Sequence, residues 1–310
     1  MLELRAQVCD TTSDMYSTQS LTITGTLLSF IITNFVALIL SSTIILLGLR
    51  KSTSVPVLRK LLLSFSDQQI ITGIGIQSLG LAKMKTMVPY HFFIIWLLSL
   101  LSTATNLTTL LALVNDFKRD WVLRWLRQFF MVVNMLLGVI SSIFILQSVM
   151  KNLEPRLPIA CVWEVEARGS SSNAALSVVG TIAVIAGQVL VFVLSTLYLH
   201  TRSNPRWLKS VQVVGLVMLT AMGVGATVRV VMSSQAFGTV PAGVNLQGKS
   251  EKEMSYGQLL PLLLLALPLV SLVEVVRGEV AQPPSKVDDD QAGLLADMEL
   301  SYQPNPIWGK

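Results

Sequence analysis

Seven stretches of about 20 predominantly apolar residues recur along the chain and constrain its fold more than any other feature. A helix of about 20 such residues spans the roughly 30 Å hydrocarbon core of a bilayer. Hydrophobic residues make up 52% of the chain and charged residues only 13%, which excludes an ordinary soluble domain. We therefore expect an all-α, polytopic bundle of seven transmembrane helices in one domain, 27–276. The expected spans are 27–49, 57–82, 89–114, 128–150, 174–200, 211–234 and 256–276.

Lysine and arginine residues predict the orientation of this bundle. They lie mainly in the first, third and fifth connections, which contain Arg50, Lys118 and Arg206, and are sparser in the other connections. Cytosolic loops beside transmembrane helices carry an excess of these residues. We therefore expect the N-terminal segment 1–26 to be lumenal or extracellular and the tail 277–310 to be cytosolic and, from its proline and aspartate content, disordered. The endoplasmic reticulum or another endomembrane is the expected location.

The charge pattern and the missing motifs exclude several functions. The net charge of +5 is spread over short loops instead of gathering on one face, so no nucleic-acid partner is expected. The sequence also has no glycine-rich phosphate loop, no paired aspartate-rich motifs for magnesium diphosphate and no Cys/His ligand spacing. We expect neither a cofactor nor a metal, and take the lipid bilayer and a lipophilic small molecule as the partners. The oligomeric state is not predicted.

The two cysteines are expected to form a disulfide. Cys9 precedes the first span and Cys161 lies between the fourth and fifth, so the expected orientation places both on the oxidising side of the membrane. Disulfides persist in such compartments. A bridge between Cys9 and Cys161 is therefore predicted, with two unrelated thiols as the alternative.

Polar residues within the apolar spans are the candidates for chemistry. A carboxylate at bilayer depth, such as Asp67, costs roughly 2.5 to 3.5 kcal/mol on insertion scales, so it is usually paired or functional. At about 1.5 Å per residue, Asp67, Asn106 and Gln188 fall in one layer near the middle of the membrane. A second layer consists of Gln77, His91, Gln147 and Arg229. Both layers should face the bundle interior, since lipid offers no polar partners.

Asp67 has two interpretations at this depth. Burial would favour its neutral form and make it a proton donor inside an apolar pocket. The alternative is structural, with Asp67 hydrogen-bonded to Asn106 or Gln188, or ion-paired with Arg229.

Three further candidates also have a structural alternative. His91 can be solvated at the membrane interface, and Arg229 can extend its guanidinium to the membrane surface. Trp96 can serve as packing instead of lining a substrate site.

The run Ser66-Asp67-Gln68-Gln69, followed by Tyr90-His91 and by Asn106-Leu107-Thr108, resembles a family of fungal seven-helix membrane proteins. Some members of that family are terpene cyclases of meroterpenoid gene clusters, which protonate an epoxide or olefin on a farnesylated substrate. The resemblance implies that Asp67 is the proton donor and that Gln68 or Gln69 orients it. Asn106 stands where histidine is usual in the family.

We therefore expect a cofactor-independent terpene cyclase of secondary metabolism, an isomerase or lyase. The candidate catalytic residues are Asp67, Gln68, Gln69, Asn106 and His91, and the candidate substrate-binding residues are Gln77, Trp96, Gln188 and Arg229.

A seven-helix receptor or sensor, or a proton-coupled transporter of a small lipophilic molecule, is the alternative function. The resemblance to G-protein-coupled receptors is limited to the helix number, because the seventh span lacks an Asn-Pro-x-x-Tyr element.

Overall fold

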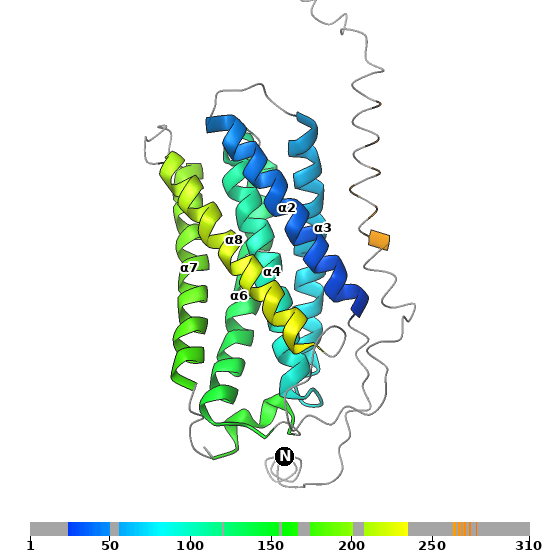
Figure 1. Cartoon of the computed structure of the whole chain (residues 1–310), viewed down its shortest axis with the longest axis vertical. Coiled ribbons are helices and arrows are strands. Elements are labelled where there is room, and N and C mark those ends of the chain that lie inside the picture. The colour runs from blue at the N-terminus through cyan, green and yellow to red at the C-terminus, as the bar shows by residue number, and fades with distance from the viewer. Residues whose placement is uncertain are drawn as a thin grey trace, which may run out of the picture.

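The computed structural model describes residues 24–49, 56–119, 121–154, 157–166, 174–200 and 208–234, together with single positions between 263 and 277. Every element in these ranges is helical, as the sequence predicts. Figure 1 shows the long helices side by side in one bundle. The elements are α2 (Thr24–Leu49), α3 (Pro56–Ala82), α4 (Pro89–Ala112), α5 (Val114–Arg119), α6 (Trp121–Met150), η1 (Ile159–Trp163), α7 (Ala174–His200) and α8 (Leu208–Ser233).

Five of the long helices, α2, α4, α6, α7 and α8, are long and apolar enough to cross a membrane. The chain is therefore an integral membrane protein. Helix α3 is as long as the others but does not join this group, because its middle carries the polar run from Ser64 to Gln69. The seventh expected span, the segment 1–23 with Cys9, and the tail lie outside the described residues, apart from single positions.

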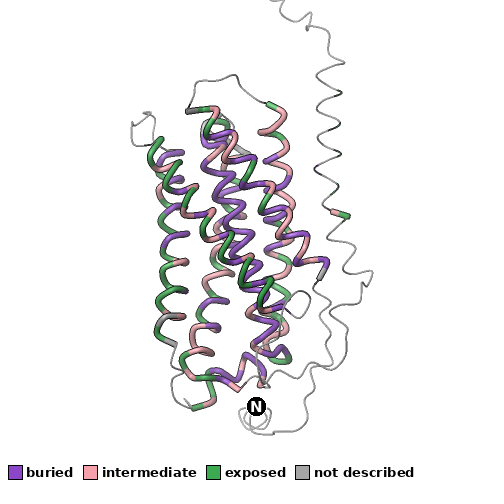
Figure 2. The backbone as a smooth tube through the Cα atoms, viewed as in Figure 1, coloured by how far each residue is buried: buried purple, intermediate pink, exposed green. Residues whose placement is uncertain are grey.

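Helix α4 forms the centre of the bundle. All of its apolar span is buried, against 22% for α8 and 28% for α7, and Figure 2 shows α4 enclosed by its neighbours. It contacts α2, α3, α6, α7 and α8. Its interior positions include small polar residues such as Ser102, Thr105 and Thr108, which allow close helix packing and can bond across helices.

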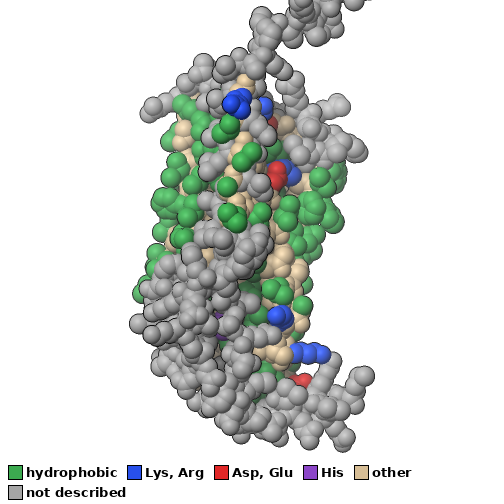
Figure 3. Space-filling model, turned by 90° about the vertical axis from the view of Figure 1, so that its right-hand side faces the viewer, with side chains coloured by type: hydrophobic (Ala, Val, Ile, Leu, Met, Phe, Trp, Pro, Cys, Tyr) green, Lys and Arg blue, Asp and Glu red, His purple; other side chains and the backbone are tan. Residues whose placement is uncertain are grey.

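The outer helices expose apolar side chains. Val179, Ile182 and Leu190 of α7 and Val214 and Val217 of α8 are all more than half exposed. Hydrophobic side chains also spread over the opposite face of the bundle, which Figure 3 shows. Lipid hydrocarbon is the solvent that suits such a surface.

A short connection covers one end of the bundle, which we call the η1 end. The amide of Ile159 donates to the Met87 carbonyl at 2.9 Å, and that of Ala160 to the Met84 carbonyl at 3.2 Å. Cys161 is buried and disulfide-bonded.

The opposite end, which we call the α5 end, is held by charge. Arg59 of α3 donates two hydrogen bonds to the Asp116 carboxylate of α5, at 2.6 and 2.9 Å. Sequence patterning did not predict α5, and α6 begins at Trp121 instead of residue 128.

Candidate functional site

Asp67 is ion-paired with Arg127 of α6 and is not enclosed by the bundle. Its side chain is 50% exposed, whereas that of Arg127 is 7% exposed. The Arg127 guanidinium also donates to the Leu63 carbonyl at 3.1 Å and lies 5.2 Å from the centre of the Phe117 ring. The Asp67 carboxylate accepts a hydrogen bond from Arg127, so the structure shows an ion pair at the bundle surface and not an isolated acid in an apolar pocket.

The partner of Asp67 differs from the three that the sequence suggested. Arg127 falls just before the expected fourth span and was read as part of a cytosolic connection. Because α6 begins at Trp121, Arg127 lies inside the helix, and its long side chain reaches α3. The sequence does contain a signal for this ion pair, because Arg127 is the arginine nearest to the start of the fourth apolar stretch.

The rotation of α3 explains why Asp67 faces outward. Its buried face contains Ser66, Gln69, Gly73 and Gln77, spaced three and four residues apart. A Cβ atom on Gly73 would lie 2.4 Å from Ser102 Oγ, so this glycine permits close contact between α3 and α4. One residue beyond Ser66, Asp67 is turned by about 100° away from that contact. The expectation that both polar layers face the bundle interior is thus wrong for Asp67, whereas Gln77 does face inward.

The neighbours of Asp67 in the motif have separate surroundings. Ser66 donates to Asn106 Oδ1 at 2.9 Å, and Asn106 donates to Ser102 Oγ at 3.4 Å. Gln69 is buried, with its amide 3.5 Å from the Phe30 carbonyl. The Gln68 side-chain oxygen is also buried and accepts no hydrogen bond from the described residues. None of these bonds joins Gln68, Gln69 or Asn106 to the Asp67 carboxylate.

Gln77 belongs to a polar network that crosses three helices. Its amide donates to Asn134 Oδ1 at 2.8 Å, and Asn134 donates to Thr103 Oγ1 at 3.1 Å. All three side chains are buried. Asn134 was not among the predicted site residues, although an asparagine within an apolar span is a recognisable signal.

His91 and Trp96 lie on α4 near the η1 end. His91 is buried, with its ring 5.1 Å from that of Tyr90, so it is not solvated at the interface. Trp96 donates its indole N–H to Ser142 Oγ at 2.6 Å. Gln188 of α7 donates to the Met222 sulfur at 3.1 Å.

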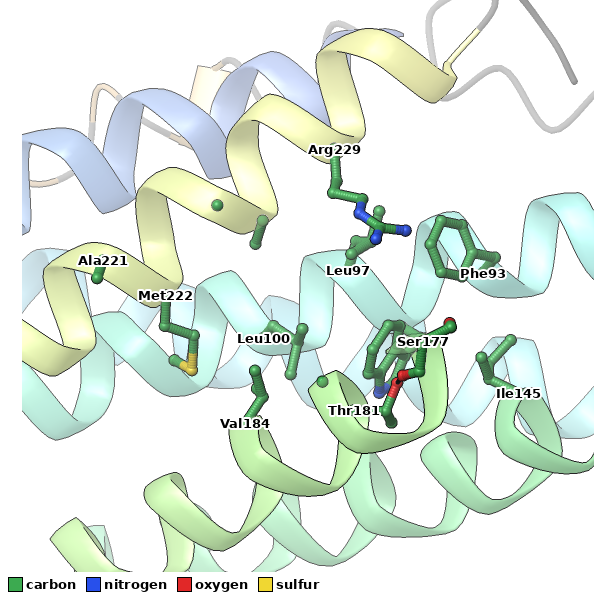
Figure 4. Close-up of a pocket in the computed structure, with 14 residues that line it drawn as sticks. Phe93, Leu97, Leu100, Ile145, Ser177, Thr181, Val184, Ala221, Met222 and Arg229 are labelled. Atoms are coloured by element: carbon green, nitrogen blue, oxygen red, sulfur yellow. Dashed lines mark hydrogen bonds between the residues drawn. The ribbon is translucent and has the colours of Figure 1, made fainter. Parts of the chain in front are cut away.

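A partly open cavity of about 280 Å³ lies between α4, α6, α7 and α8. Trp96 and Arg229, two of the four predicted substrate-binding residues, line it. Figure 4 shows the Arg229 side chain extending from α8 towards Leu97 and Phe93 of α4. The lining consists of Phe93, Trp96, Leu97, Leu100, Ile145, Ser177, Gly180, Thr181, Val184, Ala221, Met222, Gly225, Ala226 and Arg229.

The chemistry of this cavity is that of a binding site for a lipophilic molecule. Aliphatic and aromatic side chains dominate the lining, and Ser177, Thr181 and Arg229 supply its polar groups. The described lining contains no carboxylate, histidine or cysteine, and α3 contributes no residue to it. Asp67 therefore does not face this cavity. Within the ranges that the structure describes, no three His, Cys, Asp or Glu side chains come together as metal ligands.

No family model, curated protein or solved structure matches the chain. The resemblance to the fungal seven-helix family therefore stays a prediction.

Proposed function

We propose that this integral membrane protein binds a lipophilic small molecule in the cavity between α4, α6, α7 and α8, and serves as a receptor or sensor for that molecule. The observation that carries the proposal is the lining, which is apolar and aromatic and has a few polar groups. Pockets for small ligands have this composition. The described residues of the lining include no carboxylic acid and no thiol, which favours binding over acid catalysis in this cavity.

The surroundings of the cavity support entry from the bilayer. Helices α7 and α8 form two of its walls, and both expose apolar side chains on their outer faces. Gly180 and Gly225 line the cavity, and a Cβ atom on either would meet no atom within 4 Å. Both glycines are exposed, so no side chain of α7 or α8 covers the cavity at these two positions.

The positive-inside pattern puts the η1 end on the lumenal or extracellular side. The cavity then lies in that half of the membrane, because Phe93 on α4, Ser177 on α7 and Arg229 on α8 are all close to the η1 ends of their helices. An endomembrane location such as the endoplasmic reticulum is part of this proposal.

Photocrosslinking tests the binding site. The full chain in phosphatidylcholine nanodiscs is exposed to a diazirine derivative of farnesol, a neutral lipophile, and the labelled peptides are mapped. We expect saturable labelling of the cavity-lining parts of α4, α7 and α8. Gly225→Leu should reduce this labelling several-fold, because its side chain fills the cavity.

Gly75→Leu is the matched control. Gly75 is exposed on α3, has no atom within 4 Å of an added Cβ and is not part of the lining. Labelling that is spread evenly over all lipid-facing helices, or that Gly225→Leu and Gly75→Leu change equally, would refute the proposed site.

Terpene cyclisation is the second candidate, favoured by the Ser66-Asp67-Gln68-Gln69 motif and by the half exposure of Asp67 at membrane depth. A farnesylated substrate in the bilayer can approach a carboxyl group on the outside of the bundle. For this reaction Asp67 must leave Arg127 and donate a proton to an epoxide oxygen, whose C–O bond then breaks, or to an olefin carbon. The cyclised cation then loses a proton to the Asp67 carboxylate or to water, so that the product is an isomer of the substrate.

Microsomes with the wild-type chain or Asp67→Asn, supplied with a farnesylated phenol and its terminal epoxide, test this candidate by mass spectrometry. An isomeric product that disappears in Asp67→Asn supports the cyclase with Asp67 as its acid. A product that persists in Asp67→Asn removes Asp67 from that role.

A further inference from the structure

We propose that the ligand of the cavity is a single-chain amphiphile with an anionic head group, and that Arg229 binds this head group. The inference rests on the proposed function, in which the cavity binds a lipophilic molecule. It assigns the chemical class of that molecule from Arg229, the one charged residue among the described residues of the lining.

Arg229 lies at one end of the cavity and is not engaged by the rest of the described chain. It is located on α8 one turn before Ser233, at the η1 end, and its side chain is exposed. None of the described residues forms an ion pair or a hydrogen bond with it. Arg59 and Arg127, by contrast, are paired with Asp116 and Asp67. Among the described residues, no carboxylate therefore competes with an anionic ligand for the Arg229 guanidinium.

The cavity becomes apolar with distance from Arg229. Along α8 the lining continues through Ala226 to Met222, about two helical turns or roughly 10 Å deeper. Leu100 of α4 and Val184 of α7 line the same deeper part (Figure 4). A cation at one end of the cavity and a mainly apolar lining beyond it match a molecule with an anionic head and an apolar chain.

The identity of the charged residue indicates the head group. Guanidinium stays protonated and presents a planar fork of donors that binds carboxylates and phosphates in a bidentate manner. Ser177 of α7 adds a hydroxyl group to the lining near the same end. Either a free acid or a phospholipid phosphate could supply the anion.

The size of the cavity favours the free acid. Its volume of about 280 Å³ is just below the usual range for ligand pockets, roughly 300 to 1,000 Å³. Such a volume accepts one narrow chain, whereas a phospholipid brings two. We therefore assign a single-chain carboxylic acid, of the fatty-acid or isoprenoid type, as the ligand class.

Fluorescence titration distinguishes the head group from the chain. The purified full chain in phosphatidylcholine nanodiscs is titrated with cis-parinaric acid and, separately, with the corresponding alcohol, which has the same chain without the charge. We expect the acid to bind about tenfold more tightly, a difference of about 1.4 kcal/mol. Arg229→Gln should abolish that preference and leave alcohol binding unchanged, whereas Arg229→Lys should retain most of it.

Lys151→Gln is the control for surface charge, because Lys151 lies at the same end of the bundle and does not line the cavity. Equal affinities for acid and alcohol, with no effect of Arg229→Gln, would overturn the anionic head group while leaving the lipophilic site intact. If Lys151→Gln reduces the preference for the acid as much as Arg229→Gln does, the preference comes from general surface charge. That result would also overturn the role of Arg229.

Two further outcomes are separable from these. If neither probe binds saturably, and Gly225→Leu behaves as the wild type, the proposed function itself fails. If phosphatidic acid added to the nanodiscs displaces cis-parinaric acid only when Arg229 is present, the anion is a lipid phosphate, and the single-chain assignment is wrong.

Discussion

The Asp67 carboxylate of α3 is paired with the Arg127 guanidinium of α6, and the two side chains differ in their exposure, 50% against 7%. The pair joins a half-exposed anion to a buried cation that also contacts the Leu63 carbonyl and the Phe117 ring. Together with the Arg59–Asp116 pair, it attaches α3 to the α5–α6 region of the chain. These two ion pairs, in addition to apolar packing, therefore hold α3 against the rest of the bundle.

Breaking the Asp67–Arg127 pair should destabilise the protein asymmetrically. Asp67→Asn leaves a buried guanidinium without its counterion, which costs about 3 to 5 kcal/mol for fully buried pairs and less here because Asp67 is half exposed. Arg127→Gln leaves only the half-exposed carboxylate. We expect Asp67→Asn to lower the Tm more than Arg127→Gln.

The double variant Asp67→Asn/Arg127→Gln should lose less than the sum of the two single variants, since they remove the same interaction. The Tm of each variant in detergent, followed by intrinsic tryptophan fluorescence, gives the comparison. Strictly additive losses would show that the two residues do not interact.

Gly73→Ala should weaken the packing of α3 on α4. The new Cβ would lie 2.4 Å from Ser102 Oγ and 2.9 Å from Ser102 Cβ, so the helices must separate. Overpacking of this kind costs typically about 1 to 3 kcal/mol. Gly75→Ala on the same helix meets no atom within 4 Å and should be neutral or slightly stabilising.

Adding Ser102→Gly to Gly73→Ala should recover part of the lost stability, because it removes the atoms that the new methyl group meets. The same thermal measurement applies to all four proteins. Equal Tm values for Gly73→Ala and Gly75→Ala would contradict the close contact.

Thiol labelling should detect no free cysteine in the native protein. The chain has two cysteines, and Cys161 is disulfide-bonded. After denaturation without reduction, a maleimide-polyethylene glycol reagent should leave the mobility of the chain unchanged on a gel, and after reduction it should add two reagents. Cys161→Ala should bind one reagent without reduction, at Cys9. Labelling of the unreduced wild type would refute the predicted pairing.

The proposed orientation predicts glycosylation at the η1 end. Glu164 and Glu166 are exposed just after η1, and Glu164→Asn combined with Glu166→Thr creates an acceptor sequon there. In microsomes we expect a mobility shift that an endoglycosidase reverses. The natural sequon Asn106-Leu107-Thr108 is buried in α4, so the wild type should show no shift. If the new sequon is not glycosylated and the η1 end is accessible from the cytosolic face, the orientation is opposite to the proposed one.

Helix positions follow closely from the sequence, because apolar length and the need to satisfy every backbone group within the membrane leave few alternatives. Six of the seven expected spans coincide with long helices in the described ranges, and the predicted bounds of α7 agree with the structure. The start of α6 was missed, because Arg124 and Arg127 lower the local hydropathy although they are helical.

The sequence by itself determined that the chain is a bundle of membrane helices with polar residues at depth, since composition and length decide which solvent each segment can occupy. The tertiary structure decided how those polar residues are paired. A helix can rotate about its axis without changing its span, and the contact of Gly73 with Ser102 selects one rotation for α3. That rotation directs Gln69 and Gln77 inward and Asp67 outward to Arg127, and none of the three lines the cavity.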